Sequence, residues 1–123
     1  MISNFTRPTI LATACAASMV TLITSANAQN KFDGTWSVVM VTNSGPCERT
    51  YSARVQVING VVHFSGGALS GRVTVGGAVS VTASAGTGWA IGSGRLSTNS
   101  GQGTWRSQVD YRTCSGTWNG QKE

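Results

Sequence analysis

Beyond residue 28, hydrophobic and polar side chains alternate along most of the chain. Such alternation is typical of β-strands with one buried face, because successive side chains of a strand point to opposite sides of the sheet. The alternating runs are short and are separated by turn-forming residues. They predict about eight strands, near residues 32–40, 51–57, 61–65, 69–75, 79–83, 89–96, 103–109 and 112–119.

The residues between these runs favour tight turns over helices. Asn59-Gly60 is a preferred pair for a two-residue hairpin, and Gly76-Gly77 is a second candidate. All 16 glycines of the sequence lie beyond residue 28, where they disfavour helix formation. We therefore predict an all-β fold.

The sixth run, residues 89–96, is less regular than the others. It contains Gly92 and Gly94, and glycine inside a strand indicates a bulge or a bend. The pattern therefore leaves open whether Trp89 or Ala90 points inward.

The tripeptide Gly-Thr-Trp occurs three times, at 34–36, 103–105 and 116–118, each time within an alternating run. Because the connections are short, neighbouring strands should pair antiparallel as an up-and-down meander. An exposed sheet edge promotes aggregation, and closure of the sheet removes it. We expect the last strand to lie beside the first in a small closed barrel, with a two-sheet sandwich as the alternative.

The first 28 residues have the pattern of a cleaved signal peptide. A polar start with one cation, Arg7, precedes an apolar run over 10–23, and Ala26-Asn27-Ala28 matches a signal-peptidase site. The apolar run is shorter than the roughly 20 residues of a transmembrane helix, so we expect no transmembrane span. Residues 29–123 form the predicted single β domain, with eight Lys and Arg against four Asp and Glu.

Two cysteines, Cys47 and Cys114, belong to this domain. An even pair in an exported chain predicts a disulfide. If Trp118 lies beside Trp36, Cys114 would lie opposite about Met40, where Cys47 in the following loop is within reach. The predicted disulfide and the predicted closure of the barrel therefore agree with each other.

The segment Gly34-Thr35-Trp36 at the head of the first strand, together with the closing meander, resembles the calycin architecture of lipocalins and avidins. Those families often place Gly-x-Trp on the first strand, and the resemblance implies that the tryptophan plugs one end of the barrel. The chain is also similar to small, glycine-rich exported proteins of unassigned role in alphaproteobacteria, which share a Gly-Thr-Trp start and a C-terminal cysteine. This second resemblance implies no activity.

The residue types needed for catalysis are sparse. His63 is the only histidine and is expected to face solvent, and no set of metal ligands accompanies it. Asp33 and Asp110 lie near predicted strand ends, where an ion pair at the barrel edge is a simpler role than paired catalysis. We therefore predict no enzyme activity, no catalytic residues, no metal and no cofactor.

Aromatic side chains are the candidate ligand contacts. Aromatics that line the mouth of a barrel bind small apolar molecules well. The alternative is that the tryptophans simply fill the core, since an eight-stranded barrel is just wide enough for its own side chains. The candidate ligand-binding residues are Trp36, Tyr51, Trp89, Trp105 and Trp118.

Arginines on outward positions are the candidate partner surface, namely Arg54, Arg72 and Arg106. Such a surface would attract anionic envelope polymers or lipid head groups, whereas nucleic acid is not expected for an exported protein without a stacked-aromatic motif. The alternative is scattered solubilising charge. The sequence thus predicts a periplasmic or secreted binding protein, with an extracellular protease inhibitor or a structural envelope or adhesion component as alternatives.

Overall fold

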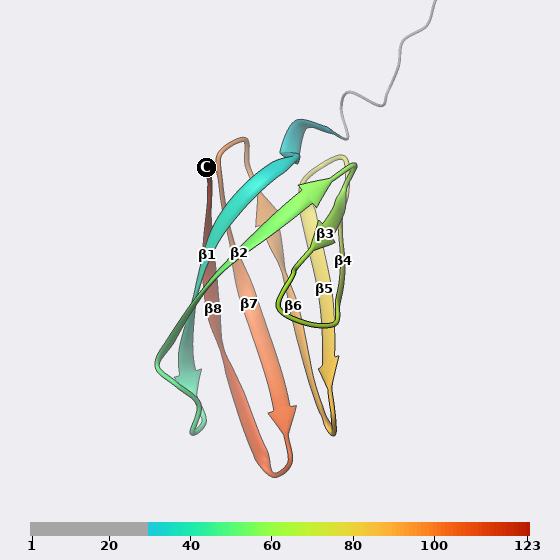
Figure 1. Cartoon of the computed structure of the whole chain (residues 1–123). Coiled ribbons are helices and arrows are strands. Elements are labelled where there is room, and N and C mark those ends of the chain that lie inside the picture. Colours follow the sequence, from blue (N-terminus) through green and yellow to red (C-terminus); the bar gives the residue numbers. More distant parts are fainter. Residues whose placement is uncertain (1–29) are drawn as a thin grey trace, which may run out of the picture.

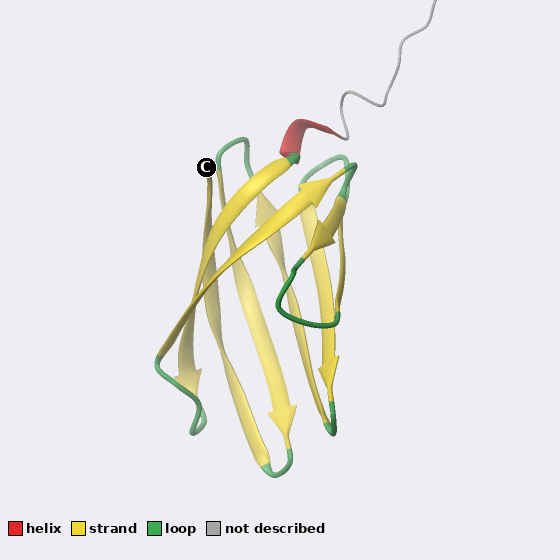
Figure 2. Cartoon of the chain, in the orientation of Figure 1, coloured by secondary structure: helices red, strands yellow, loops and turns green. Residues whose placement is uncertain are grey.

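The computed structural model describes residues 30–123, so the predicted signal peptide lies outside the described residues. The chain forms eight antiparallel strands in one closed barrel, with each strand bonded to its neighbours in sequence (Figures 1 and 2). This confirms the all-β meander and the barrel in preference to the sandwich. The elements are η1 (Asn30–Phe32), β1 (Gly34–Ser44), β2 (Thr50–Ile58), β3 (Val61–His63), β4 (Leu69–Val73), β5 (Ala78–Ala85), β6 (Gly88–Leu96), β7 (Ser100–Val109) and β8 (Arg112–Lys122).

The barrel closes where β8 pairs with β1, but in a register different from the predicted one. Trp118 pairs with Met40, and Trp36 pairs with Lys122. The strand β8 runs three residues beyond its predicted end. Each residue of β1 pairs with a residue of β8 that lies four positions later than predicted. This register places the two indoles at different heights, whereas the predicted one would have set both directly opposite each other inside the barrel.

One end of the barrel is filled by large apolar side chains, and we call it the plugged end. The short 3-10 helix η1 lies over this end, close to the end of β8 (Figure 1). Phe32 and Trp36 are almost fully buried there, and the Trp36 Nε1–H donates to the Phe32 carbonyl at 2.9 Å. Val57, Val62, Val73 and Leu96 belong to the same buried cluster.

The opposite end is fastened by the predicted disulfide, which the structure confirms. Cys47 in the β1–β2 loop bonds to Cys114 of β8, with their Cα atoms 6.2 Å apart. Gly45 adopts a φ of 102°, a conformation that favours glycine, and a Cβ there would overlap the Cys114 backbone and sulfur. The loop can therefore cross directly over β8.

The wall of the barrel is not equally tall all round. The strand β3 has three residues and β4 has five, and the loop between them turns back about halfway along the barrel (Figure 1). The strand β4 ends at Val73, earlier than predicted, because Thr74 and Ala78 close a turn through backbone and side-chain hydrogen bonds. Val75 lies exposed in that turn and not on the inner face.

The sixth strand is regular, unlike the prediction of a bulge. The strand β6 pairs with β5 and with β7 over its whole length without a register shift. Ala90 points inward and Trp89 outward, which settles the orientation that the sequence left open.

Candidate ligand-binding site

The interior of the barrel contains an apolar cavity of about 290 Å³ that is partly open to solvent. Its walls come from all eight strands, and no charged side chain of residues 30–123 lines it. Trp36, Val57 and Leu96 of the plugged end form its floor, while Met40 and Ala83 lie towards the other end. The interior is therefore a hydrophobic space with no group that could hold a charge or a metal.

The cavity exists because small side chains face inward in the half of the barrel away from the plug. Ala53, Ala83 and Ala90 all line the cavity. An eight-stranded barrel is just wide enough for its own side chains to fill when these are large. Alanine at these three positions leaves that space empty.

The second and third Gly-Thr-Trp tripeptides lie side by side and accommodate each other. In the β7–β8 ladder Gly103 pairs with Trp118, and Trp105 pairs with Gly116. Each glycine thus lies next to the tryptophan of the other tripeptide. The repeat is a reciprocal packing device in which each indole occupies space that a side chain on the opposite strand would need.

The glycine positions also provide the indoles with hydrogen-bond acceptors. A Cβ at Gly116 would overlap the carbonyl oxygen of Val41, and that same oxygen accepts the Trp105 Nε1–H at 3.2 Å. The Thr117 carbonyl also accepts it, at 3.1 Å. Because Gly116 has no side chain, this carbonyl is accessible to the indole inside the barrel.

Trp118 repeats this arrangement on the neighbouring strands. A Cβ at Gly103 would overlap the Ser93 carbonyl oxygen, and the Trp118 Nε1–H donates to that oxygen at 3.1 Å. With the Trp36 bond to Phe32, all three inward tryptophans satisfy their only polar hydrogen within the protein. The indoles therefore present apolar surface to the cavity.

Three of the five aromatic candidates are thus brought together. Trp36, Trp105 and Trp118 line the cavity, while Trp89 lies on the outer face of β6 with 38% of its surface exposed. Tyr51 pairs with Met40 near the end away from the plug, is 41% exposed, and accepts a hydrogen bond from the Glu48 N–H at 3.3 Å. Neither Tyr51 nor Trp89 lines the cavity.

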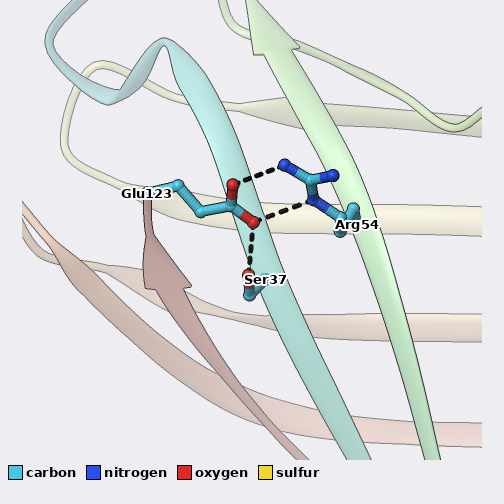
Figure 3. A network of polar contacts seen from close by, with 3 residues as sticks. All are labelled: Ser37, Arg54 and Glu123. Atoms are coloured by element: carbon cyan, nitrogen blue, oxygen red, sulfur yellow. Dashed lines mark hydrogen bonds and ion pairs between the residues drawn. The ribbon is translucent and has the colours of Figure 1, made fainter.

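The three candidate arginines are not brought together. They are exposed on β2, β4 and β7, and β1 and β8 separate β2 from β7 on one side of the barrel. Arg54 is engaged within the protein, because its guanidinium binds both carboxylate oxygens of Glu123, and the Ser37 hydroxyl donates to the same carboxylate (Figure 3). Arg72 and Arg106 lie on strands that are not adjacent to each other or to the strand of Arg54.

The Arg54–Glu123 pair ties β2 to the end of β8 across β1. The hydrogen bonds from Arg54 and Ser37 lower the pKa of the Glu123 carboxyl, and the carboxylate in turn raises the pKa of Arg54. In the sequence Glu123 is only one of four acidic residues and was not a candidate site residue. No local motif marks it, since its partners lie 69 and 86 residues away in sequence.

The remaining candidate chemistry is dispersed. His63 is exposed on β3, as expected. Asp33 lies at the plugged end and accepts the Asn59 N–H at 2.8 Å, whereas Asp110 lies in the β7–β8 turn and accepts the Thr87 hydroxyl at 3.1 Å. The two carboxylates are at opposite ends of the barrel, so they form no catalytic pair, and within residues 30–123 neither makes the expected ion pair with a cation.

Residues 30–123 offer neither a metal-binding cluster nor a membrane-spanning helix. They contain no cluster of three or more His, Cys, Asp or Glu side chains that could hold a metal ion. No helix in this part of the chain is long and apolar enough to cross a membrane.

No family model, no curated protein and no solved structure matches this chain. The resemblance to lipocalins and avidins, based on Gly34-Thr35-Trp36 and the barrel, therefore stays a prediction.

Proposed function

We propose that this protein is an exported, non-catalytic binding protein that holds a small apolar ligand inside its barrel. The observation that carries the proposal is a cavity of about 290 Å³ that Trp36, Trp105 and Trp118 help to line and whose walls offer almost no polar surface. Apolar cavities stay dry, and an engineered cavity of about 150 Å³ binds benzene. The cavity in this barrel has about twice the volume of that engineered cavity, so it suits a hydrocarbon or aromatic group larger than benzene.

Export rests on the disulfide and on the leader pattern. Disulfides form and persist in oxidising compartments, which fits a periplasmic or secreted protein. The absence of charged side chains from the cavity walls supports ligands whose buried part is uncharged, since burial of an unpaired charge is strongly unfavourable.

Tryptophan fluorescence tests this proposal, because three of the four tryptophans line the cavity. We expect a saturable change in emission on titration with a panel of alkanols, medium-chain fatty acids, monoterpenes and benzene derivatives. A panel without any saturable response would refute the cavity as a binding site.

Two substitutions on neighbouring positions of β5 give a matched control. Ala83 lines the cavity, whereas Ser84 is exposed on the outer face. Ala83→Leu should fill the cavity and abolish the response, and Ser84→Leu should leave it unchanged. Equal loss in both variants would show that the response does not come from the cavity.

An anionic partner bound by the candidate arginines has less support than a ligand in the cavity. The positions of Arg54, Arg72 and Arg106 on three separate strands fit dispersed solubilising charge better than one binding patch. The alternatives of a protease inhibitor or an envelope component rest on the small, disulfide-fastened barrel alone.

A further inference from the structure

The strand β2 carries a free edge in the middle of an otherwise continuous wall. It has nine residues, but β3 pairs only with Gln56, Val57 and Ile58. On the side facing β3, residues 50–55 have no ladder partner, because the β3–β4 loop has already turned back (Figure 1). On their other side the same residues pair with β1 throughout.

The ladder with β1 shows which backbone groups point into this free edge. The Arg49 carbonyl accepts the Thr42 N–H, so Arg49 directs its backbone groups towards β1. In an antiparallel ladder this direction alternates from residue to residue. Thr50, Ser52 and Arg54 therefore direct their N–H and C=O groups away from β1, and within residues 30–123 no hydrogen bond to these groups is formed.

The free edge borders the cavity. Ala53 and Val55 of this stretch line the cavity, as do Phe64 and Leu69 at the two ends of the β3–β4 loop. A strand added beside β2 would continue the line of β3 where Phe64 leaves it. Directly opposite residues in a ladder place their side chains on the same face, so alternate side chains of an added strand would point into the cavity.

We propose that β2 takes up an extended segment of a partner polypeptide, which adds as a strand beside residues 50–55 and inserts apolar side chains into the barrel. Strand addition of this kind obtains affinity from backbone hydrogen bonds and specificity from pockets for alternate side chains. Here the backbone N–H and C=O groups that Thr50, Ser52 and Arg54 direct away from β1 supply the hydrogen bonds. The cavity supplies the pockets for alternate side chains.

Charge favours a foreign segment over a second copy of this chain. Residues 30–123 carry eight Lys and Arg against four Asp and Glu. Arg54 is already paired with Glu123, but self-pairing of the edge would still bring together two copies with the same excess of positive charge, which opposes association. The segment expected to bind alternates apolar residues with acidic or neutral ones.

This inference adds a partner class to the cavity of the proposed function, and it can fail independently of it. Amide hydrogen exchange monitored by NMR gives the direct test. In the free protein the amides of Thr50, Ser52 and Arg54 should exchange fast, while those of Tyr51, Ala53 and Val55, which point to β1, should be protected. Protection of all six in the free protein would overturn the inference.

The probe is the peptide acetyl-Thr-Leu-Asp-Leu-Thr-Leu-amide. At a concentration of 100 times its dissociation constant, the peptide should slow hydrogen exchange of the Thr50, Ser52 and Arg54 amides about 100-fold. A version of the peptide N-methylated at alternate residues keeps its side chains but loses its donors, so it should not bind. Equal binding of both versions, or binding without protection of these amides, would contradict strand addition.

Ser52→Pro and Ser52→Ala form the matched pair of variants. Proline removes an N–H that the β1 ladder does not use and blocks edge pairing, whereas alanine keeps it. We expect Ser52→Pro to lose the peptide but to keep the fluorescence response to small apolar molecules, and Ser52→Ala to keep both. Concentration-dependent dimerisation that protects the same amides would assign the edge to a second copy instead.

Discussion

The two halves of the barrel differ in how they fill their interior. At the plugged end Phe32, Trp36 and Leu96 pack to almost complete burial. In the other half, which we call the cavity half, Ala53 and Ala83 face inward and leave space. Most strands run through both halves, so the difference lies in the cover that η1 gives to the plugged end, in the size of the inward side chains and in the shorter wall at β3 and β4.

The two halves of the barrel contribute differently to stability. A tightly packed half makes most of the apolar contacts that stabilise a small domain, which leaves the other half free of the need to be filled. In the cavity half the Cys47–Cys114 disulfide links the β1–β2 loop to β8, where Cys114 and Trp105 are also buried. Substitutions in the two halves should therefore have unequal effects.

The largest effect is expected from paired phenylalanine substitutions. Phe32 is 1% exposed within the plug, whereas Phe64 is only partly buried beside the cavity. Phe32→Ala should lower the free energy of unfolding by about 3–5 kcal/mol, the range for fully buried phenylalanine, and Phe64→Ala by about 1 kcal/mol. Urea unfolding of the two variants measures both values. Equal losses would show that the two halves are equally well packed.

A smaller effect is expected at the glycines that accommodate the indoles. A Cβ at Gly116 would overlap the Val41 carbonyl, whereas one at Gly76 would meet nothing within 4 Å. Gly116→Ala should cost about 1–3 kcal/mol through overpacking and shift the Trp105 emission. Gly76→Ala should stay within about 0.5 kcal/mol of the original protein. Thermal unfolding and fluorescence spectra distinguish them, and a neutral Gly116→Ala would remove glycine as the reason for this packing.

The smallest effect concerns the ion pair between β2 and β8. The pKa of Glu123 is lowered in the folded state, so its contribution to stability is present above the ordinary glutamate value of 4.5 and is lost as the pH falls below it. Glu123→Gln should lower the melting temperature slightly at pH 7, and the two melting curves should converge in acid. Because the pair is exposed, added salt should reduce the difference. A difference that grows in acid would contradict this assignment.

The fold was largely predictable because its signals are local. Period-two alternation and turn residues such as Asn59-Gly60 placed the eight strands, and the two cysteines indicated how the barrel is fastened. The register of β8 against β1 was wrong by four residues, since both strands alternate evenly and each shift by two keeps the same faces buried.

The candidate site was only partly predictable. The pattern placed Trp36, Trp105 and Trp118 inward, but it could not show that Gly103 and Gly116 lie beneath the partner indoles. That relation depends on the pairing of β7 with β8. The free edge of β2 had no signal either, because it results from β3 being shorter than its alternating run.

The seam between β1 and β8 has a consequence for the order of events during folding. Trp36 pairs with Lys122, so β1 lacks its second neighbouring strand until β8 is available. The sheet cannot close until residues 112–122 are available to pair with β1. Until then β1 and β7 each expose an unpaired side to other polypeptides, and this interval is when the protein is most vulnerable to aggregation and proteolysis.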